Sequence, residues 1–187
     1  MARPRDPAAD TAILDAAIAL IRDVGYDAVT MGGVAERAGV GKATLYRRWK
    51  TKELLVGVAL LGIASRIPEA DTGSTAGDLG AVMRATVAMY RDPATRELLS
   101  GLIAAMARSA RIGAALRRGF IAKRRDAMRN ALKKGVRRGD LRRGTDIELA
   151  VDLLSGPLLH RALISGARID ERLARALVHV VLRAFGT

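Results

Sequence analysis

Residues 30–49 read TMGGVAERAGVGKATLYRRW. The stretch predicts a short helix, a turn at Gly39 and a second short helix, because small or apolar residues stand wherever two steeply crossing helices must touch. Ala35 suits the crossing, and a glycine directly after a helix end often takes a left-handed conformation that costs other residues energy. The positions that we expect to be buried between the helices are Val34, Ala38, Val40, Leu45 and Trp49.

The second predicted helix presents a polar and basic face on the side away from its buried positions. Cations, hydroxyls and one small residue on such a face are typical of a helix that enters the major groove of DNA. A helical hairpin with a merely solvated polar face is the alternative that spacing alone leaves open. The residues expected on or near this face are Lys42, Ala43, Thr44, Tyr46, Arg47 and Arg48.

The longer stretch TMGGVAERAGVGKATLYRRWKTKELLV resembles the DNA-binding signature of the TetR family of bacterial transcriptional regulators. The resemblance extends back to Thr11. More loosely, the segments DPATRELLSGL, RRGDL and GPLLHRALISG resemble the C-terminal ligand-binding and dimerisation region of one TetR subgroup. The resemblance implies a homodimeric, ligand-responsive repressor that binds double-stranded DNA at a palindromic operator and is released by an unknown small-molecule inducer.

Three glycines depart from the family pattern at the starts of the two motif helices. Gly32 and Gly33 fall in the first turn of the first helix, where glycine raises the entropic cost of ordering. Gly41 stands where a serine is usual before the recognition helix, so a hydroxyl N-cap is absent. We therefore expect a recognition helix that is less tightly ordered without DNA.

Composition favours an all-α fold. The chain has 187 residues, of which 50% are apolar and only 3% aromatic, and no alternating strand pattern of any length occurs. We expect about nine helices, with a three-helix DNA-binding domain in residues 1–52, whose residues 1–10 form a basic arm, and a larger ligand-binding and dimerisation domain in residues 53–187. Helices are expected at 11–24, 52–67, 78–90, 93–109, 145–165 and 170–185, and a helix or a broken pair of helices within 108–143.

Several classes of protein are disfavoured. The absence of cysteine and the presence of only two histidines argue against disulfides, thiolate chemistry and a zinc site, so no metal or cofactor is expected. The longest apolar run, residues 54–64, is too short to span a membrane, and the N-terminus lacks the apolar core of a secretory signal. We expect a soluble cytoplasmic protein with no membrane partner.

The net charge of +13 is unevenly distributed. Residues 1–52 carry a net +3, residues 53–107 a net −2, residues 108–143 a net +12 and residues 144–187 none. The basic stretch 108–143 is open to three interpretations: a solvated helix face, a field that speeds association with DNA, or a surface that holds an anionic ligand or an acidic partner.

The resemblance and the residue types together give candidate site residues. Cations and hydroxyls are expected at the major groove and at phosphates, and Ala43 permits close approach of the helix to DNA. The family encloses its inducer between helices of the C-terminal region. The DNA-binding candidates are Thr30, Lys42, Ala43, Thr44, Tyr46, Arg47 and Lys52, with Arg3 and Arg5 from the arm, and the inducer-pocket candidates are Met83, Val87, Tyr90, Leu102, Met106, Phe120 and His160.

The last two expected helices are candidates for a dimer interface. The first of them is apolar around most of its circumference, so we expect it to be covered on two sides, by its own domain and by a second copy. Pairing of both helices with those of the second copy would form a four-helix interface. The interface candidates are Leu153, Leu154, Leu158, Leu163, Leu173, Leu177, Val180 and Val181.

An enzyme or binding module for an acidic or phosphorylated ligand, built on the basic stretch 108–143, is the alternative function. The pair Gly41-Lys42 fits it badly, because a phosphate-binding loop needs a glycine where Glu36 stands and a Ser or Thr where Ala43 stands. No nucleophile and base pair is evident either. We expect no enzymatic activity. A basic surface that binds membranes is a third interpretation, but the aromatic anchors expected at a membrane interface are missing.

Overall fold

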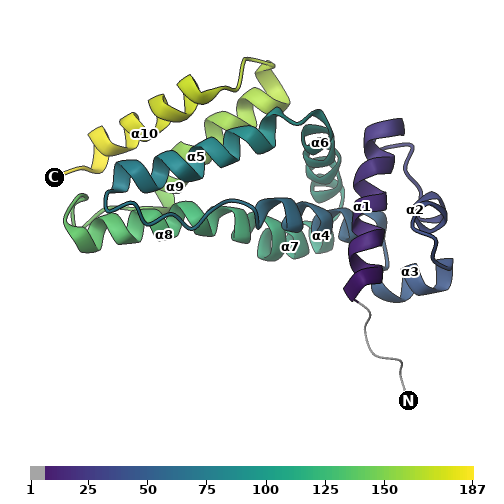
Figure 1. Ribbon diagram of the computed structural model, residues 1–187. Coiled ribbons are helices and arrows are strands. Elements are labelled where there is room, and N and C mark those ends of the chain that lie inside the picture. Colours follow the sequence, from purple (N-terminus) through teal and green to yellow (C-terminus); the bar gives the residue numbers. More distant parts are fainter. Residues whose placement is uncertain (1–6) are drawn as a thin grey trace. The chain divides into compact units, whose positions relative to one another are not determined.

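The computed structural model describes residues 7–187, and these form helices connected by turns (Figure 1). Within that range the only bridge between extended segments is an isolated one joining Leu141 and Gly186. No helix in the described part of the chain is long and apolar enough to cross a membrane. The α-helices are α1 Pro7–Val24, α2 Met31–Arg37, α3 Lys42–Arg48, α4 Lys52–Ala64, α5 Thr75–Arg91, α6 Pro93–Arg108, α7 Ala110–Leu116, α8 Ala122–Arg138, α9 Ile147–His160 and α10 Glu171–Phe185.

Two short π-helical segments continue the α-helices. The segment η1, Arg117–Ile121, joins α7 to α8, and η2, Arg161–Ser165, continues α9. Counted as unbroken helices, the elements of residues 7–187 number nine, and the all-α prediction is confirmed. The basic stretch thus contains a continuous helical run with a local change of spacing, which ends at Gly139 with φ +86°.

The chain divides into two compact units. Unit 1 runs up to Gly62 and resumes over Pro93–Phe120, whereas unit 2 comprises Ile63–Asp92 and Ile121–Thr187. This division follows packing alone, so the functional boundary expected between residues 52 and 53 stays a prediction.

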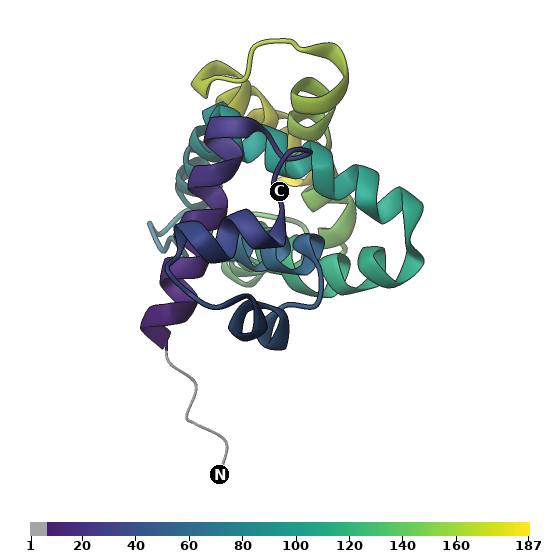
Figure 2. The ribbon, with the colours of Figure 1, turned by 90° about the vertical axis from the view of Figure 1, so that its right-hand side faces the viewer.

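Unit 1 is organised around α1. This helix packs against α2 and α6, α3 packs against α2, and α7 packs against α6 (Figures 1 and 2). Ile13, Ala17 and Ile21 stand one turn apart on α1 and are completely buried. The helix begins at Pro7, where a missing N–H is harmless, so residues 7–10 are helical and do not belong to the expected arm.

Unit 2 is built around α5. This helix contacts α8, α9 and α10, and α9 also contacts α8 and α10. It begins three residues earlier than the apolar pattern predicts, because the Ser74 hydroxyl accepts a hydrogen bond from the N–H of Gly77 (3.1 Å) and caps the helix. Asp146 and Asp170 cap α9 and α10 in the same way. The core side chains include Leu79, Val82, Met83, Tyr90, Met128, Leu132, Leu154 and Leu158.

A polar network joins the start of α5 to the end of α8. Asp140 accepts hydrogen bonds from the N–H and the hydroxyl of Thr75 (2.9 and 2.8 Å). Asp78 is completely buried and accepts hydrogen bonds from the N–H of Thr72 (2.6 Å) and from Arg138 (2.8 Å). The buried carboxylate therefore has both a backbone donor and a cation, as a buried charge requires.

Candidate nucleic-acid interface

The turn between α2 and α3 has the geometry that the glycine pattern predicts. Gly39 has φ +65°, in the left-handed region. The N–H of Gly39 bonds to the carbonyl of Glu36 (3.1 Å), and the N–H of Val40 bonds to that of Ala35 (3.0 Å), so the turn satisfies carbonyls at the end of α2. A side chain at Gly39 would be strained by the backbone conformation, although no neighbour lies within 4 Å.

The inner faces of the two motif helices are closed by apolar side chains. Val34 and Leu45 are completely buried, and Ala35 and Trp49 are nearly so. The other two positions expected in this contact, Ala38 and Val40, are half-buried. The inner side of α3 therefore rests on the rest of the motif, which leaves its opposite side for a partner.

The outer face of α3 carries most of the side chains that the sequence places there. Lys42, Ala43, Tyr46 and Arg47 are exposed, and 46% of the Tyr46 surface is accessible despite its aromatic ring. Thr44 is half-buried. An exposed aromatic hydroxyl beside two cations gives this face groups that could contact both base edges and phosphates.

The two motif helices differ in how their N-termini are capped. The Thr30 hydroxyl accepts a hydrogen bond from the N–H of Gly33 (3.0 Å) and caps α2. Gly41 caps α3 without a side-chain hydrogen bond, as its missing hydroxyl predicts. A side-chain carbon at Gly32 would lie 3.3 Å from Cε of Lys42, so the small residue leaves room for the lysine stem.

Arg48 has a structural partner that the sequence did not reveal. Its guanidinium forms a salt bridge with Asp10 on α1, and both side chains are largely buried. Helical spacing places Arg48 on or near the outer face, but the structure turns it towards α1. The ion pair therefore ties α3 to α1.

Lys52 also has partners within unit 1. Its Nζ donates hydrogen bonds to the carbonyls of Tyr26 (2.8 Å) and Asp27 (3.3 Å), and it lies 4.4 Å from the centre of the Tyr26 ring. An ammonium has three donors, so one hydrogen remains for the phosphate contact that stays predicted for this residue. Arg3 and Arg5, the candidates from the arm, lie outside the described residues.

The turn after α1 is also held by α6. The Glu97 carboxylate accepts a hydrogen bond from the N–H of Tyr26 (3.0 Å), and a side-chain carbon at Gly101 would overlap the Tyr26 ring. Burial raises the pKa of Tyr26 to about 12. Sequence reasoning missed this contact, because no local spacing relates residues 71 positions apart.

The seven inducer-pocket candidates are divided between the two units. Met83, Val87 and Tyr90 lie in the core of unit 2, whereas Leu102 and Phe120 are buried and Met106 is half-buried in unit 1. His160 is exposed in unit 2 instead of buried as expected, because it falls on the outer side of the last turn of α9. As an inducer pocket, this set stays a prediction.

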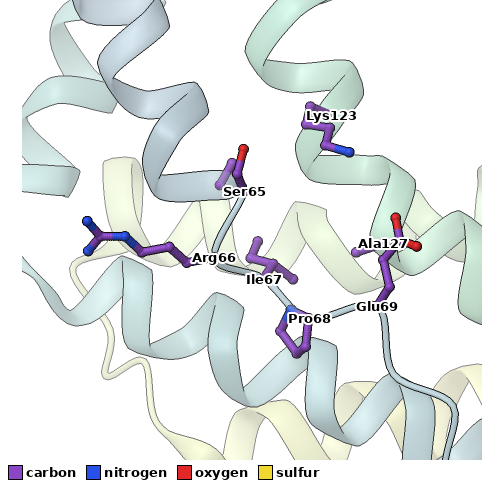
Figure 3. A pocket seen from close by; sticks show the side chains of 8 residues that line it. Ser65, Arg66, Ile67, Pro68, Glu69, Lys123 and Ala127 are labelled. Carbon is purple, nitrogen blue, oxygen red and sulfur yellow. The ribbon is translucent and has the colours of Figure 1, made fainter. Parts of the chain in front are cut away.

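A cavity of about 350 Å³ lies in unit 2, at a place that the sequence did not suggest (Figure 3). It is bounded by the end of α4, the following loop and the first half of α8. Its lining residues are Ala64, Ser65, Arg66, Ile67, Pro68, Glu69, Lys123 and Ala127.

The expected dimer-interface residues differ in their exposure. Leu154, Leu158, Leu173, Leu177 and Val181 are buried in the core of unit 2, because α9 and α10 turn these positions towards their own unit. Leu163 is half-buried. The remaining two, Leu153 and Val180, have 37% and 50% of their surface exposed. Two further large apolar residues in this part of the chain are exposed, Leu149 on α9 and Ile164 in η2.

Several charges of the basic stretch are balanced within unit 2. Arg125 pairs with Glu148 and Asp152, and Arg129 pairs with Glu148 and Asp126. Lys134 and Arg138 both pair with Asp71, and Arg138 also reaches Asp78 and Asp140. Four of the fourteen basic residues in this stretch are therefore used for packing helices together, and less positive charge is left to attract a distant partner than the sequence suggests.

Family models match both parts of the chain. Residues 13–58 match the model of bacterial regulatory proteins of the tetR family, and residues 69–181 match that of the tetracyclin repressor-like C-terminal domain. The uncharacterized HTH-type transcriptional regulator YdeS of Bacillus subtilis is 37% identical over 178 residues, covering 94% of this chain and 89% of the relative. The DNA-binding transcriptional repressor TetR of Mycobacteroides abscessus is 32% identical over 168 residues, covering 87% and 86%.

A solved structure agrees in both fold and sequence. The crystal structure of the TetR family transcription regulator SCO0332 matches with a TM-score of 0.79 and 32% identity over 94% of this chain and 97% of that one. Together with the motif geometry, these matches define a helix-turn-helix transcriptional regulator that binds DNA. The chain belongs to the TetR family. This family consists of regulators and is not enzymatic, so the enzyme alternative is discarded.

Proposed function

We propose that this regulator is a homodimeric repressor that binds a palindromic operator in the bacterial cytoplasm and is released by a small molecule. The observation that carries the proposal is the two-sided character of α3. Leu45 is completely buried on one side, while Lys42, Tyr46 and Arg47 are exposed on the other. A helix held on one face and polar on the other can enter a major groove without refolding.

The exposed apolar residues of unit 2 support a dimer. Leu149 and Leu153 stand four residues apart on α9, so they lie on one face, and 48% and 37% of their surfaces are exposed. Val180 on α10 and Ile164 in η2 are also exposed, with 50% and 76% of their surfaces accessible. Exposed apolar side chains of this kind favour burial against the same surface of a second copy, because a two-fold interface is self-complementary.

Dimerisation would explain how a short motif reads an operator. Two copies of α3 related by a two-fold axis would contact successive major grooves, so the operator would be a palindrome. A ligand that binds better when the two motifs have the wrong separation would shift the population away from the DNA-bound form. Repression, as opposed to activation, is supported by the name of the relative from Mycobacteroides abscessus.

The proposal is tested by selecting operators from random duplex DNA with the full-length protein. We expect enrichment of an inverted repeat whose half-sites are about one helical turn apart or somewhat more. Lys42→Ala and Tyr46→Phe should change the enriched bases, and Lys133→Ala, on an exposed position of α8, is the matched control. Enrichment of no inverted repeat by the wild type would overturn the proposal.

A further inference from the structure

Arg124 on α8 is a buried cation with an incomplete set of partners. Only 4% of its surface is exposed. Its Nη1 donates a hydrogen bond to the Tyr90 hydroxyl, and the guanidinium lies 5.7 Å from the centre of the Tyr90 ring. Its Nε is buried without a hydrogen-bond partner among residues 7–187, and within that range no ion pair joins it to a carboxylate.

The Tyr90 hydroxyl does not supply the missing charge. Burial raises the pKa of Tyr90, so the phenol is neutral near pH 7. A buried charge is costly unless an opposite charge and hydrogen bonds compensate it, and buried arginines are normally paired for that reason. The neighbouring Arg125 and Arg129 follow this rule with Glu148, whereas Arg124 does not. Arg124 therefore lacks an anion.

The cavity of unit 2 lies on the same part of α8. Lys123 and Ala127 line it, and Arg124 stands between them in the chain. With 3.6 residues per turn, Arg124 lies about 60° from Ala127 and about 100° from Lys123 around the helix, so it borders the lining residues on the side of α8 that contacts Tyr90. The volume of about 350 Å³ suits a small molecule at the lower end of ligand-site sizes.

The lining of the cavity combines apolar and basic groups. Its apolar members are Ala64, Ile67, Pro68 and Ala127. Lys123 and Arg66 are its cations, and Glu69 is its one carboxylate, so a clear surplus of positive charge on the α8 side depends on Arg124. Figure 3 shows the Arg66 side chain extending away from Lys123 and Glu69, which leaves Lys123 as the lining cation on the α8 side.

We propose that this cavity binds a small organic anion with a short apolar body, and that Lys123 and Arg124 balance the charge of its acidic group. The inference rests on the proposed function, because it names the chemistry of the effector that unit 2 takes. The apolar lining holds the body of the molecule, and the buried guanidinium, whose Nε–H has no partner among the described residues, donates charge-assisted hydrogen bonds to its carboxylate or phosphate group. Glu69 disfavours molecules that carry a second acidic group.

Four probes of equal chain length test the charge preference. Hexanoate, hexyl phosphate, neutral hexanamide and hexylammonium are titrated separately into the full-length protein in a calorimeter. We expect at least one of the two anions to bind about tenfold more tightly than hexanamide, since one charge-assisted hydrogen bond supplies such a factor. Tighter binding of hexylammonium, or no preference for either anion over the amide up to millimolar concentrations, overturns the proposal.

Three variants test the two cations. Lys123→Met and Arg124→Met should each weaken binding of the preferred anion about tenfold, whereas Lys133→Met, which removes an exposed charge from the same helix, should leave it unchanged. Arg124→Met should also keep or raise Tm, because replacing an unpaired buried charge by an apolar side chain is often stabilising. A fall in Tm with unchanged anion affinity would make Arg124 a structural partner of Tyr90 and overturn its assigned role. Unchanged affinity in Lys123→Met overturns the site.

Operator binding separates this inference from the proposed function. Without a probe, Lys123→Met should shift operator DNA as the wild type does, because Lys123 lies outside the DNA-binding motif. The preferred anion should release the wild type from DNA at lower concentration than it releases Lys123→Met. If an anion binds but leaves DNA binding intact, ligand-controlled repression is contradicted and the anion site is not. If hexanamide alone releases the operator, only the anion site is contradicted.

Discussion

Arg138 donates a hydrogen bond from Nη2 to Oδ2 of Asp78 across 2.8 Å, and the Asp78 side chain is completely buried. The two residues are 60 positions apart, and their pairing fastens the last turn of α8 to the first turn of α5. A residue of the strongly basic stretch thus neutralises an acid that could not otherwise be buried. We therefore expect the stability of unit 2 to depend on this contact more than on surface ion pairs.

Asp78→Asn should destabilise the protein by about 2 kcal/mol, since it removes a hydrogen bond between charged groups and leaves the guanidinium of Arg138 without its buried partner. Urea unfolding of the full-length chain measures the loss. Asp71→Asn is the matched control, because Asp71 meets the same Arg138 at 3.5 Å with 71% of its side chain exposed. The control should change stability by less than about 0.5 kcal/mol. Equal effects of the two substitutions would contradict the role given to burial.

Acid should weaken the contact between α8 and α9. Hydrogen bonds from Arg129 and then Arg125 lower the pKa of Glu148 from 4.5 to about 2. In the unfolded chain this carboxylate takes up a proton near its ordinary pKa, so between about pH 5 and pH 2 the unfolded state binds more protons and stability falls as pH falls. Glu148→Gln should therefore flatten the decline of the urea midpoint over that range. Identical slopes for variant and wild type would contradict this assignment.

Local sequence signals predicted the fold well. Gly39, where the sequence predicts a turn, has positive φ, as do Gly25 and Gly139, which also follow helix ends. The recognition helix was also predictable, because Leu45 and Trp49 fix its inner face by spacing alone. Such features depend on residues within one or two turns of each other, and a single sequence contains them.

Contacts between distant segments were not predictable. Helical spacing placed Arg48 near the DNA-binding face, but its position at the edge of α3 brings it to Asp10, 38 residues earlier. For α9 the apolar residues on most of its circumference predict that two surfaces cover it, but they do not say which residues face its own unit and which would face a second copy. Only packing shows that Leu154 and Leu158 are core while Leu153 remains exposed. The buried Arg124 gave no local signal at all.

Arg47 and Arg48 should respond differently to salt. Arg47 is exposed on α3 and is expected at a phosphate, so Arg47→Met should weaken operator binding and reduce the slope of log affinity against log salt by about one per subunit. Arg48 is held by Asp10, so Arg48→Met should weaken binding by loosening α3 from α1, with the slope unchanged. Gel shifts over a salt series measure both quantities. A reduced slope for Arg48→Met would show that it contacts DNA.

Val180→Asp should convert the proposed dimer to a monomer. Half of the Val180 surface is exposed on α10 of the isolated chain, so the monomer should tolerate a carboxylate there. In a two-fold interface both copies would carry this carboxylate, and both charges would lose their contact with water. Sedimentation at micromolar concentration should show a dimer for the wild type and a monomer for the variant. Val58→Asp is the matched control, because Val58 on α4 is a valine with 39% of its surface exposed and belongs to unit 1, whereas the proposed interface residues belong to unit 2. Loss of the dimer in both variants, or in neither, would exclude this face of α10 from the interface.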